Sequence, residues 1–164
     1  MKVLKTAALA AALAVSMGTA AKAADIVDTV LAKPEFSTLA KMVKQAGLVE
    51  TLKGDGPFTV FAPTNDAFKK WPENEVALFL KAGKEKHLVR LLKTHVVPGA
   101  VLSTDVAGKT TEAKNVEGKL LKVDGTDGVK VDGATVTQAD IKVDNGVIHV
   151  IDSPLKPEAY RGSF

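Results

Sequence analysis

The chain has 164 residues with no cysteine, so it forms no disulfide and no thiolate metal site, and thiol catalysis is excluded. It carries 22 basic and 19 acidic residues, but three of the lysines lie within the first 23 residues, which leaves 19 charges of each sign in the rest. Because a net charge near zero gives no basic field, we expect no nucleic-acid binding.

Residues 1–23 have the pattern of a secretory signal peptide. Two lysines precede an apolar run over residues 7–15, and small alanine residues precede the expected cut before Ala24. The run is too short to cross a bilayer, which needs about 20 apolar residues, and no later segment approaches that length. We therefore expect a periplasmic or secreted protein with no transmembrane segment, and one domain over residues 24–164.

The first half of this domain predicts helices. Apolar residues recur at helical spacing over 25–32 and again from Phe36 to Gly47, where the glycine suits a left-handed helix end. A short helix is expected around residues 76–80, and a longer one over 87–96.

One aromatic and β-branched run interrupts these helices. Phe58 to Phe61 suits a buried strand, and Pro63, which has no N–H to donate, is expected to end it. Thr64 then stands at an N-cap position, and the carboxylate of Asp66 falls in the first turn, where the helix dipole favours negative charge.

The second half changes to a period of two, which is typical of antiparallel sheet. The expected strands are 101–102, 109–112, 119–123, 129–131, 135–137, 141–143 and 147–151. Asp132-Gly133 and Asn145-Gly146 predict two-residue hairpin turns, because both residues of each pair tolerate positive φ.

The segments 56–68 and 145–152 together resemble the two signature blocks of the fasciclin (FAS1) domain, and the resemblance covers nearly all of the chain after the first two dozen residues. It implies a single α+β domain with N-terminal helices packed on a twisted antiparallel sheet or wedge. The change of period independently favours this class. We expect structural roles for the residues that carry the two blocks: Phe58, Phe61, Pro63, Thr64, Asn65, Asp66, Phe68, Asn145, Gly146, His149 and Asp152.

The same resemblance implies four candidate partner-binding residues. Asp140 and Ile141 match an Asp-Ile pair implicated in receptor binding by animal fasciclin domains. Thr94 and His95 match a Tyr-His pair that animal relatives use in adhesion, with threonine in place of the tyrosine. The simpler alternatives are that Asp140 forms a turn, that Ile141 points into the core, and that His95 lies on an apolar stripe with a partner for each ring nitrogen.

Other polar residues favour structural interpretations. His149 is expected at the edge of the core and His87 in solvent, and their spacing predicts no metal site. Residues 124–128 lack the ligand set of a calcium loop and predict a turn. Glu73 and Glu75 are expected among solvated helix charges. We expect no cofactor and no catalytic residues.

These features lead to two hypotheses of function. The resemblance implies an exported, non-catalytic adhesion or binding module that recognises a protein or cell-surface macromolecule, and we expect a monomer. The alternative is a carrier of a small hydrophobic ligand such as a carotenoid, as some fasciclin relatives are. The chain has eight aromatic residues, most of them needed by the core, which argues against the carrier.

Overall fold

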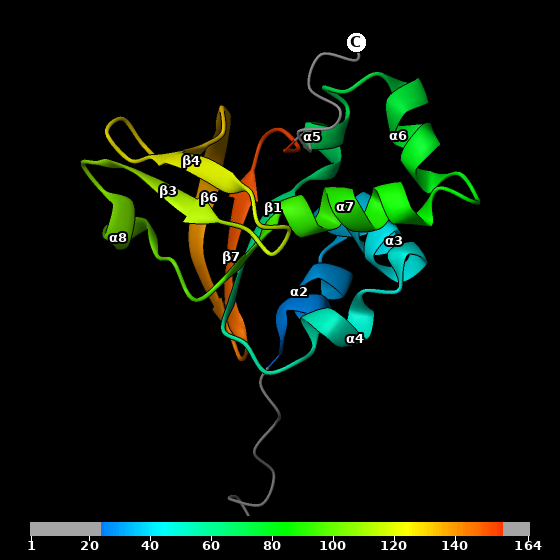
Figure 1. Cartoon of the computed structure of the whole chain (residues 1–164), viewed down its shortest axis with the longest axis horizontal. Helices are drawn as coiled ribbons and strands as arrows, with labels where there is room; N and C mark the ends of the chain where they lie inside the picture. The colour runs from blue at the N-terminus through cyan, green and yellow to red at the C-terminus, as the bar shows by residue number, and fades with distance from the viewer. Residues whose placement is uncertain (1–23, 156–164) are drawn as a thin grey trace, which may run out of the picture.

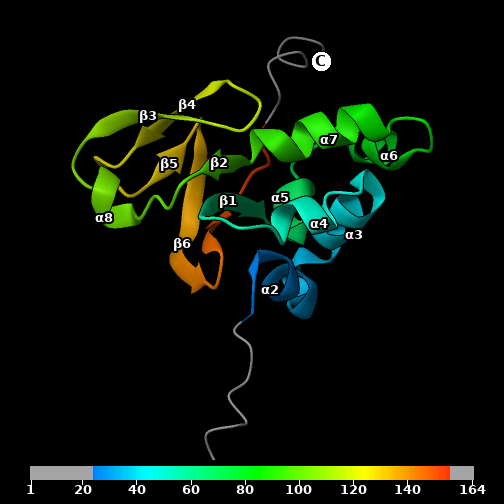
Figure 2. The ribbon, with the colours of Figure 1, turned by 60° about the horizontal axis from the view of Figure 1, so that its bottom comes forward.

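The computed structural model describes residues 24–155, in which a group of helices packs against one curved sheet (Figures 1 and 2). The expected signal peptide lies outside the described residues. The helices are α2 (Ile26–Ala32), η2 (Pro34–Phe36), α3 (Ser37–Ala46), α4 (Val49–Leu52), α5 (Asn65–Phe68), α6 (Glu73–Leu80), α7 (Glu85–Thr94) and α8 (Ser103–Val106). The strands are β1 (Phe58–Pro63), β2 (Val96–Pro98), β3 (Thr110–Lys114), β4 (Leu120–Asp124), β5 (Lys130–Val131), β6 (Ala134–Val143) and β7 (Gly146–Ile151).

The seven strands form one sheet in the order β2-β1-β7-β6-β5-β4-β3. The expected α+β class is confirmed, and all strand pairs but one are antiparallel. The exception is β1, which runs parallel to β7, a pairing that the sequence patterns did not indicate. The sheet curves so strongly that its two end strands, β2 and β3, come together. Val116 N, just after β3, donates to Val96 O on β2 at 2.9 Å.

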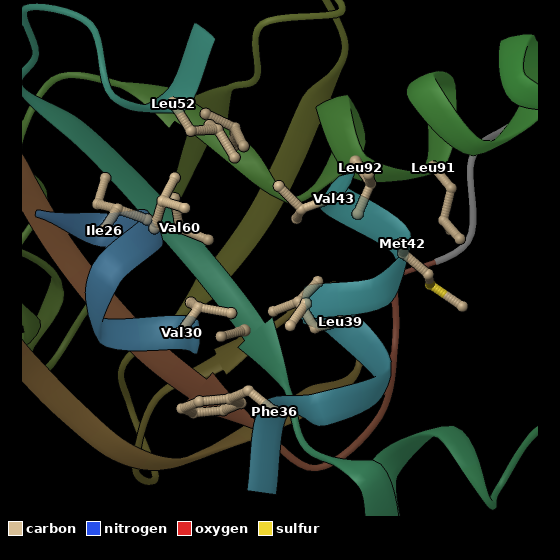
Figure 3. Packing of buried hydrophobic residues seen from close by; sticks show 14 of the residues in the cluster. Ile26, Val30, Phe36, Leu39, Met42, Val43, Leu52, Val60, Leu91 and Leu92 are labelled. Carbon is tan, nitrogen blue, oxygen red and sulfur yellow. The ribbon is translucent and has the colours of Figure 1, made fainter. Parts of the chain in front are cut away.

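Hydrophobic side chains form two clusters, one on each face of the sheet. The larger cluster lies under the helices and includes Ile148 and Val150 of β7. The smaller lies inside the curve of the sheet and includes Phe61 and Ile151. This division confirms the alternation expected for the last strand. Figure 3 shows the helix side, where side chains from α2, α3 and α7 surround Val60 of β1.

The helix ends follow the expected chemistry in most places. Gly47 closes α3 at φ +70°, and the Asp25 side chain caps α2 by accepting from Asp28 N. The expected end of the α7 helix was wrong: it stops at Thr94, because Val96 belongs to β2 and pairs with β1. No helix within residues 24–155 is both long and apolar enough to cross a membrane.

Two strand predictions also need correction. Residues 101–102 form no strand and lead instead into α8. Residues 135–137 and 141–143 belong to one long strand, β6, whose register against β7 shifts twice between Val136 and Ile141. At these register shifts the alternation of apolar and polar residues is interrupted although the strand continues. The sequence pattern therefore indicated two strands with a turn between them.

The two hairpin predictions had different outcomes. Asp132 and Gly133 have φ +51° and +93°, as a type I′ turn requires. The other turn is formed by Asp144 and Asn145 without positive φ, and Gly146 is already part of β7. Gly146 is needed there for close packing, since a Cβ atom would lie 1.9 Å from Phe58 O.

The Thr64 cap gives the first testable prediction. Its Oγ1 accepts from Ala67 N at 3.2 Å, which confirms the expected N-cap. We expect Thr64→Ala to lower the free energy of unfolding by about 1 kcal/mol, as measured by urea denaturation. Thr64→Ser keeps the oxygen and is the matched control, so an equal loss in both variants would contradict the capping role.

Candidate functional site

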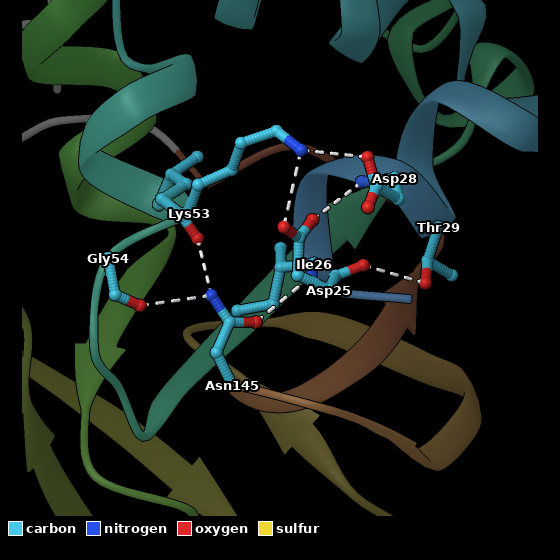
Figure 4. Close-up of polar contacts among 8 residues, drawn as sticks. Asp25, Ile26, Asp28, Thr29, Lys53, Gly54 and Asn145 are labelled. Atoms are coloured by element: carbon cyan, nitrogen blue, oxygen red, sulfur yellow. Dashed lines mark hydrogen bonds and ion pairs between the residues drawn. The ribbon is translucent and has the colours of Figure 1, made fainter. Parts of the chain in front are cut away.

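Asn145 joins three segments that are far apart in the sequence (Figure 4). Its Nδ2 donates to Leu52 O at 2.7 Å and to Gly54 O at 3.3 Å. Its Oδ1 accepts from Ile26 N at 3.0 Å. One amide therefore ties the start of α2, the end of α4 and the β6–β7 turn together, which gives a physical reason for the asparagine in the second signature block.

A charged group lies beside this amide. Lys53 Nζ contacts Asp28 at 2.8 Å and Asp25 at 3.3 Å, as Figure 4 shows. Hydrogen bonds to Asp28 and Asp25 raise the pKa of Lys53, the bond to Asp28 having the larger effect. The lysine therefore stays charged, and its charge is balanced locally by these two carboxylates.

We expect Asn145→Ala to lower the free energy of unfolding by about 2 kcal/mol, because it leaves partly buried backbone groups of Ile26 and Leu52 without their partner. Urea denaturation measures the loss. Asn145→Asp keeps the acceptor for Ile26 N but loses the donor, so it should fall between the alanine variant and the unchanged protein. Equal stability of all three proteins would show that the amide contributes nothing.

A groove of about 700 Å³ lies beside Asn145. One wall is the segment 53–57 that leads into β1, and the opposite wall includes Ala100 and Leu102. Residues 142–147, around the β6–β7 turn, complete the lining. The groove is thus built from the start of the second signature block and from two loops that lie far from it in the sequence.

Three strands hold the loop 99–103 in place. Thr59 Oγ1 on β1 donates to Gly99 O at 2.6 Å and accepts from Val101 N at 2.8 Å. His149 on β7 binds Val101 O through Nε2 at 2.6 Å. Because Asp140 N donates to His149 Nδ1 at 3.2 Å, the proton of the neutral ring lies on Nε2. His149 was expected at the edge of the core, but it is only 3% exposed, and it stacks on Phe61 with ring centroids 5.6 Å apart.

Asp140 on β6 fastens the end of the same loop. Its Oδ1 accepts from Ser103 N at 2.7 Å, and its Oδ2 accepts from the Ser103 hydroxyl. The hydroxyl has the largest effect in lowering the pKa of Asp140. The turn interpretation was wrong, since Asp140 lies within β6 at φ +58°, a conformation that aspartate tolerates better than most residues. Ile141 is half-buried against the larger cluster.

We expect Asp140→Ala to lower the free energy of unfolding by about 1 to 2 kcal/mol, through loss of two hydrogen bonds to a charged group and an unfavourable φ for alanine. Asp140→Asn keeps an acceptor for Ser103 and tolerates the backbone, so it should retain most of the stability. Thermal melts at pH 7 measure both. An alanine variant as stable as the unchanged protein would contradict this role.

Thr94 and His95 lie away from the groove, at the end of α7. Both are buried, with 4% and 3% of their surface exposed. His95 Nε2 accepts from Leu155 N at 2.8 Å, so Nδ1 carries the proton and donates to Leu91 O at 2.7 Å. Burial lowers the pKa of His95 to about 4, although the bond to Leu91 opposes the shift. Both ring nitrogens have backbone partners, as the structural interpretation expected.

The remaining sequence predictions can be placed as well. His87 is exposed, and Asp124 Oδ1 accepts from Thr126 N at 3.0 Å, which confirms a turn there. Glu73 is exposed, but Glu75 is only 3% exposed, so its expected solvation was wrong. Glu75 lies one turn before the buried Phe79 and shares its face of α6.

Among residues 24–155, no group of three acidic or histidine side chains could hold a metal ion.

The residues of the first signature block also have definite places. Asn65 on α5 binds three groups of the η2–α3 junction: its Oδ1 accepts from Thr38 N, and its Nδ2 donates to Pro34 O and Ser37 Oγ. Phe68 belongs to the larger cluster, and Asp66 pairs with Lys69 at 2.9 Å on the surface. In the second block, Asp152 Oδ1 accepts from Thr135 N at 2.9 Å.

A curved sheet covered by helices, with loops held by buried polar side chains, defines a scaffold that presents surface loops. A family model described as the fasciclin domain matches residues 34–157. Because the match covers well over half of the chain, the chain belongs to the fasciclin domain family. One solved member of the family comes from an insect cell adhesion molecule.

Three similar proteins illustrate the range of this family. Protein sll1483 of Synechocystis sp. is 46% identical over 145 residues, which cover 87% of this chain and 79% of that protein. Transforming growth factor-beta-induced protein ig-h3 of Sus scrofa is 37% identical over 82% of this chain, but only 19% of its own length is covered. A solved FAS1 domain pair from the insect cell adhesion molecule Fasciclin I has a TM-score of 0.71 at 20% identity, over 82% of this chain and 51% of that one.

The family resemblance indicated Asp140 and Ile141 as candidates, but no sequence pattern indicated the groove beside them. Thr59, Lys53 and Ser103 were not singled out, since none belongs to a recognisable motif. The one available signal was Thr59, a polar residue within an apolar strand, which the structure shows to be fully buried.

Proposed function

We propose that this chain is an exported, non-catalytic binding module that recognises a macromolecular partner at the cell envelope or outside the cell. The fasciclin family match over residues 34–157 carries the proposal. The signal-peptide pattern of residues 1–23 supports a periplasmic or secreted location. The partner is a protein or another cell-surface macromolecule, and the module acts as a monomer without a cofactor.

We propose a supporting role for Thr94 and His95 in this function. Both are buried, so a partner has no direct access to them. His95 joins α7 to Leu155, and Thr94 Oγ1 donates to Arg90 O at 2.9 Å. Asp140 likewise acts through the loop that it fastens, since its two carboxylate oxygens are already bonded to Ser103.

The structure offers little support for the hydrophobic carrier. The apolar cavity between α2, α3 and β1 has a volume of about 20 Å³, roughly the space of one water molecule. Pockets for small ligands usually measure about 300 to 1,000 Å³. A carotenoid could enter this cavity only after a large opening of the core.

Capture from the native envelope fraction tests the proposed function. The exported protein, tagged at its C-terminus, is recovered with its bound material, which is analysed by mass spectrometry and by an absorbance scan for pigment. We expect a reproducible macromolecular partner without pigment. The control variant Glu112→Gln, which changes an exposed carboxylate on β3, should capture the same partner. A copurified pigment with no macromolecule would replace this proposal with the carrier.

A further inference from the structure

The groove between the segment 53–57 and the loop 99–103 has a volume of about 700 Å³. Its lining mixes half-buried apolar groups such as Leu102 and Val143 with charged residues. Shape and chemistry of this kind suit a polymer segment with alternating side chains more than a compact apolar molecule.

Both walls of the groove are held by internal hydrogen bonds. Thr59, His149 and Asp140 fix the loop 99–103, and Asn145 fixes the opposite wall through Gly54 O. The groove is therefore preformed. Because its surface is already ordered, it loses little conformational entropy when it binds a partner.

The charges of the groove indicate what it can bind. Lys53 is engaged by Asp25 and Asp28, so it offers little to a partner. Asp55 and Asp144 also line the groove, and neither belongs to any of the ion pairs formed within residues 24–155. Lys142 is the other lysine in the lining. The two negative charges of Asp55 and Asp144 outnumber its one positive charge. The groove therefore favours a partner with a basic side chain.

We propose that this groove binds an extended segment of a protein partner that carries a lysine or arginine side chain. The ammonium or guanidinium group lies between Asp55 and Asp144, while neighbouring apolar side chains of the segment contact Leu102 and Val143. This inference rests on the proposed function and specifies the site through which the module binds. Thr59, Asp140 and His149 are positioning residues that hold one wall.

Amide chemical shifts of the purified, isotope-labelled protein provide the test. The probe is a blocked tetrapeptide of alternating lysine and valine, and its matched control replaces lysine by glutamate. We expect the lysine peptide to shift the amides of Gly54, Ala100 and Asp144, and the glutamate peptide to leave them unchanged. Asp55→Asn and Asp144→Asn should each weaken binding about two- to fivefold, as for an exposed ion pair. Glu112→Gln, an exposed carboxylate on β3, should leave it unaltered.

Several results would overturn the inference. Shifts elsewhere on the domain would refute the groove, equal binding of the glutamate peptide would refute the charge preference, and no shift with either peptide would refute both. Envelope capture separates these failures from a failure of the proposed function. If the Asp55→Asn, Asp144→Asn double variant retains the captured partner as well as the unchanged protein does, the binding function stands and the groove is not its site.

Discussion

Phe61→Ala is expected to lower the free energy of unfolding by about 3 to 5 kcal/mol, the usual cost of truncating a buried aromatic residue. Phe61 is 2% exposed and belongs to the cluster enclosed by the curved sheet. It lies opposite His149 in the parallel β1–β7 pair and stacks on its ring. The truncation therefore leaves a cavity and also removes the contact that orients the histidine holding the loop 99–103.

Urea denaturation at pH 7 measures this loss, and Phe61→Leu is the matched control. Leucine keeps most of the apolar volume but has no ring to stack on His149, so it should cost clearly less than alanine. A loss below about 1 kcal/mol for Phe61→Ala would mean that the small cluster collapses around the cavity or contributes little to stability.

Local chemistry accounts for the parts of the fold that the sequence predicted well. Thr64 caps a helix through its own hydroxyl, and Gly47 ends α3 through its own φ. The alternation in β7 places Ile148 and Ile151 on opposite faces whatever the neighbouring strands are. Each of these predictions depends only on residues within a few positions of one another.

The errors arise where distant segments decide the outcome. Val96 has helical neighbours but pairs with Val60 on β1, so α7 ends earlier than its apolar pattern indicates. The parallel pairing of β1 with β7 joins the two signature blocks directly, and no local pattern encodes the direction of a pair. The groove likewise forms from 53–57, 99–103 and 142–147, which only the tertiary structure brings together.

In the candidate site, too, the sequence indicated individual residues but not the distant partners that they contact. The sequence identified Asp140, but its partner Ser103 lies 37 positions away, so the fastening of the loop could not be read from either residue. Asn145 was expected to form a tight turn with Gly146, yet its main contacts are with Leu52 and Ile26. Both residues do more than stabilise a local turn. Asp140 holds the loop 99–103 and Asn145 holds the segment around Gly54, so each fixes one wall of the groove.

Acidification should destabilise the domain through His95. Its pKa is about 4 in the folded state, compared with 6.5 for an ordinary histidine, because burial disfavours the charged ring. Between these two values the unfolded chain binds a proton that the folded chain does not, so stability falls as the pH falls. Relative to pH 7.5, we expect a loss of about 3 kcal/mol by pH 4.

Urea denaturation at pH 7.5, 5.5 and 4.5 distinguishes this contribution from the general effect of acid. His95→Gln can still donate to Leu91 O but has no titrating group, so the variant should be less stable at pH 7.5 and should lose about 2.5 kcal/mol less than the unchanged protein on going to pH 4.5. Carboxylates contribute equally in both proteins, since the substitution leaves them in place. If the two proteins show the same dependence on pH, His95 does not remain neutral in the folded state, and its place beside Leu91 and Leu155 must open readily enough to admit a charge.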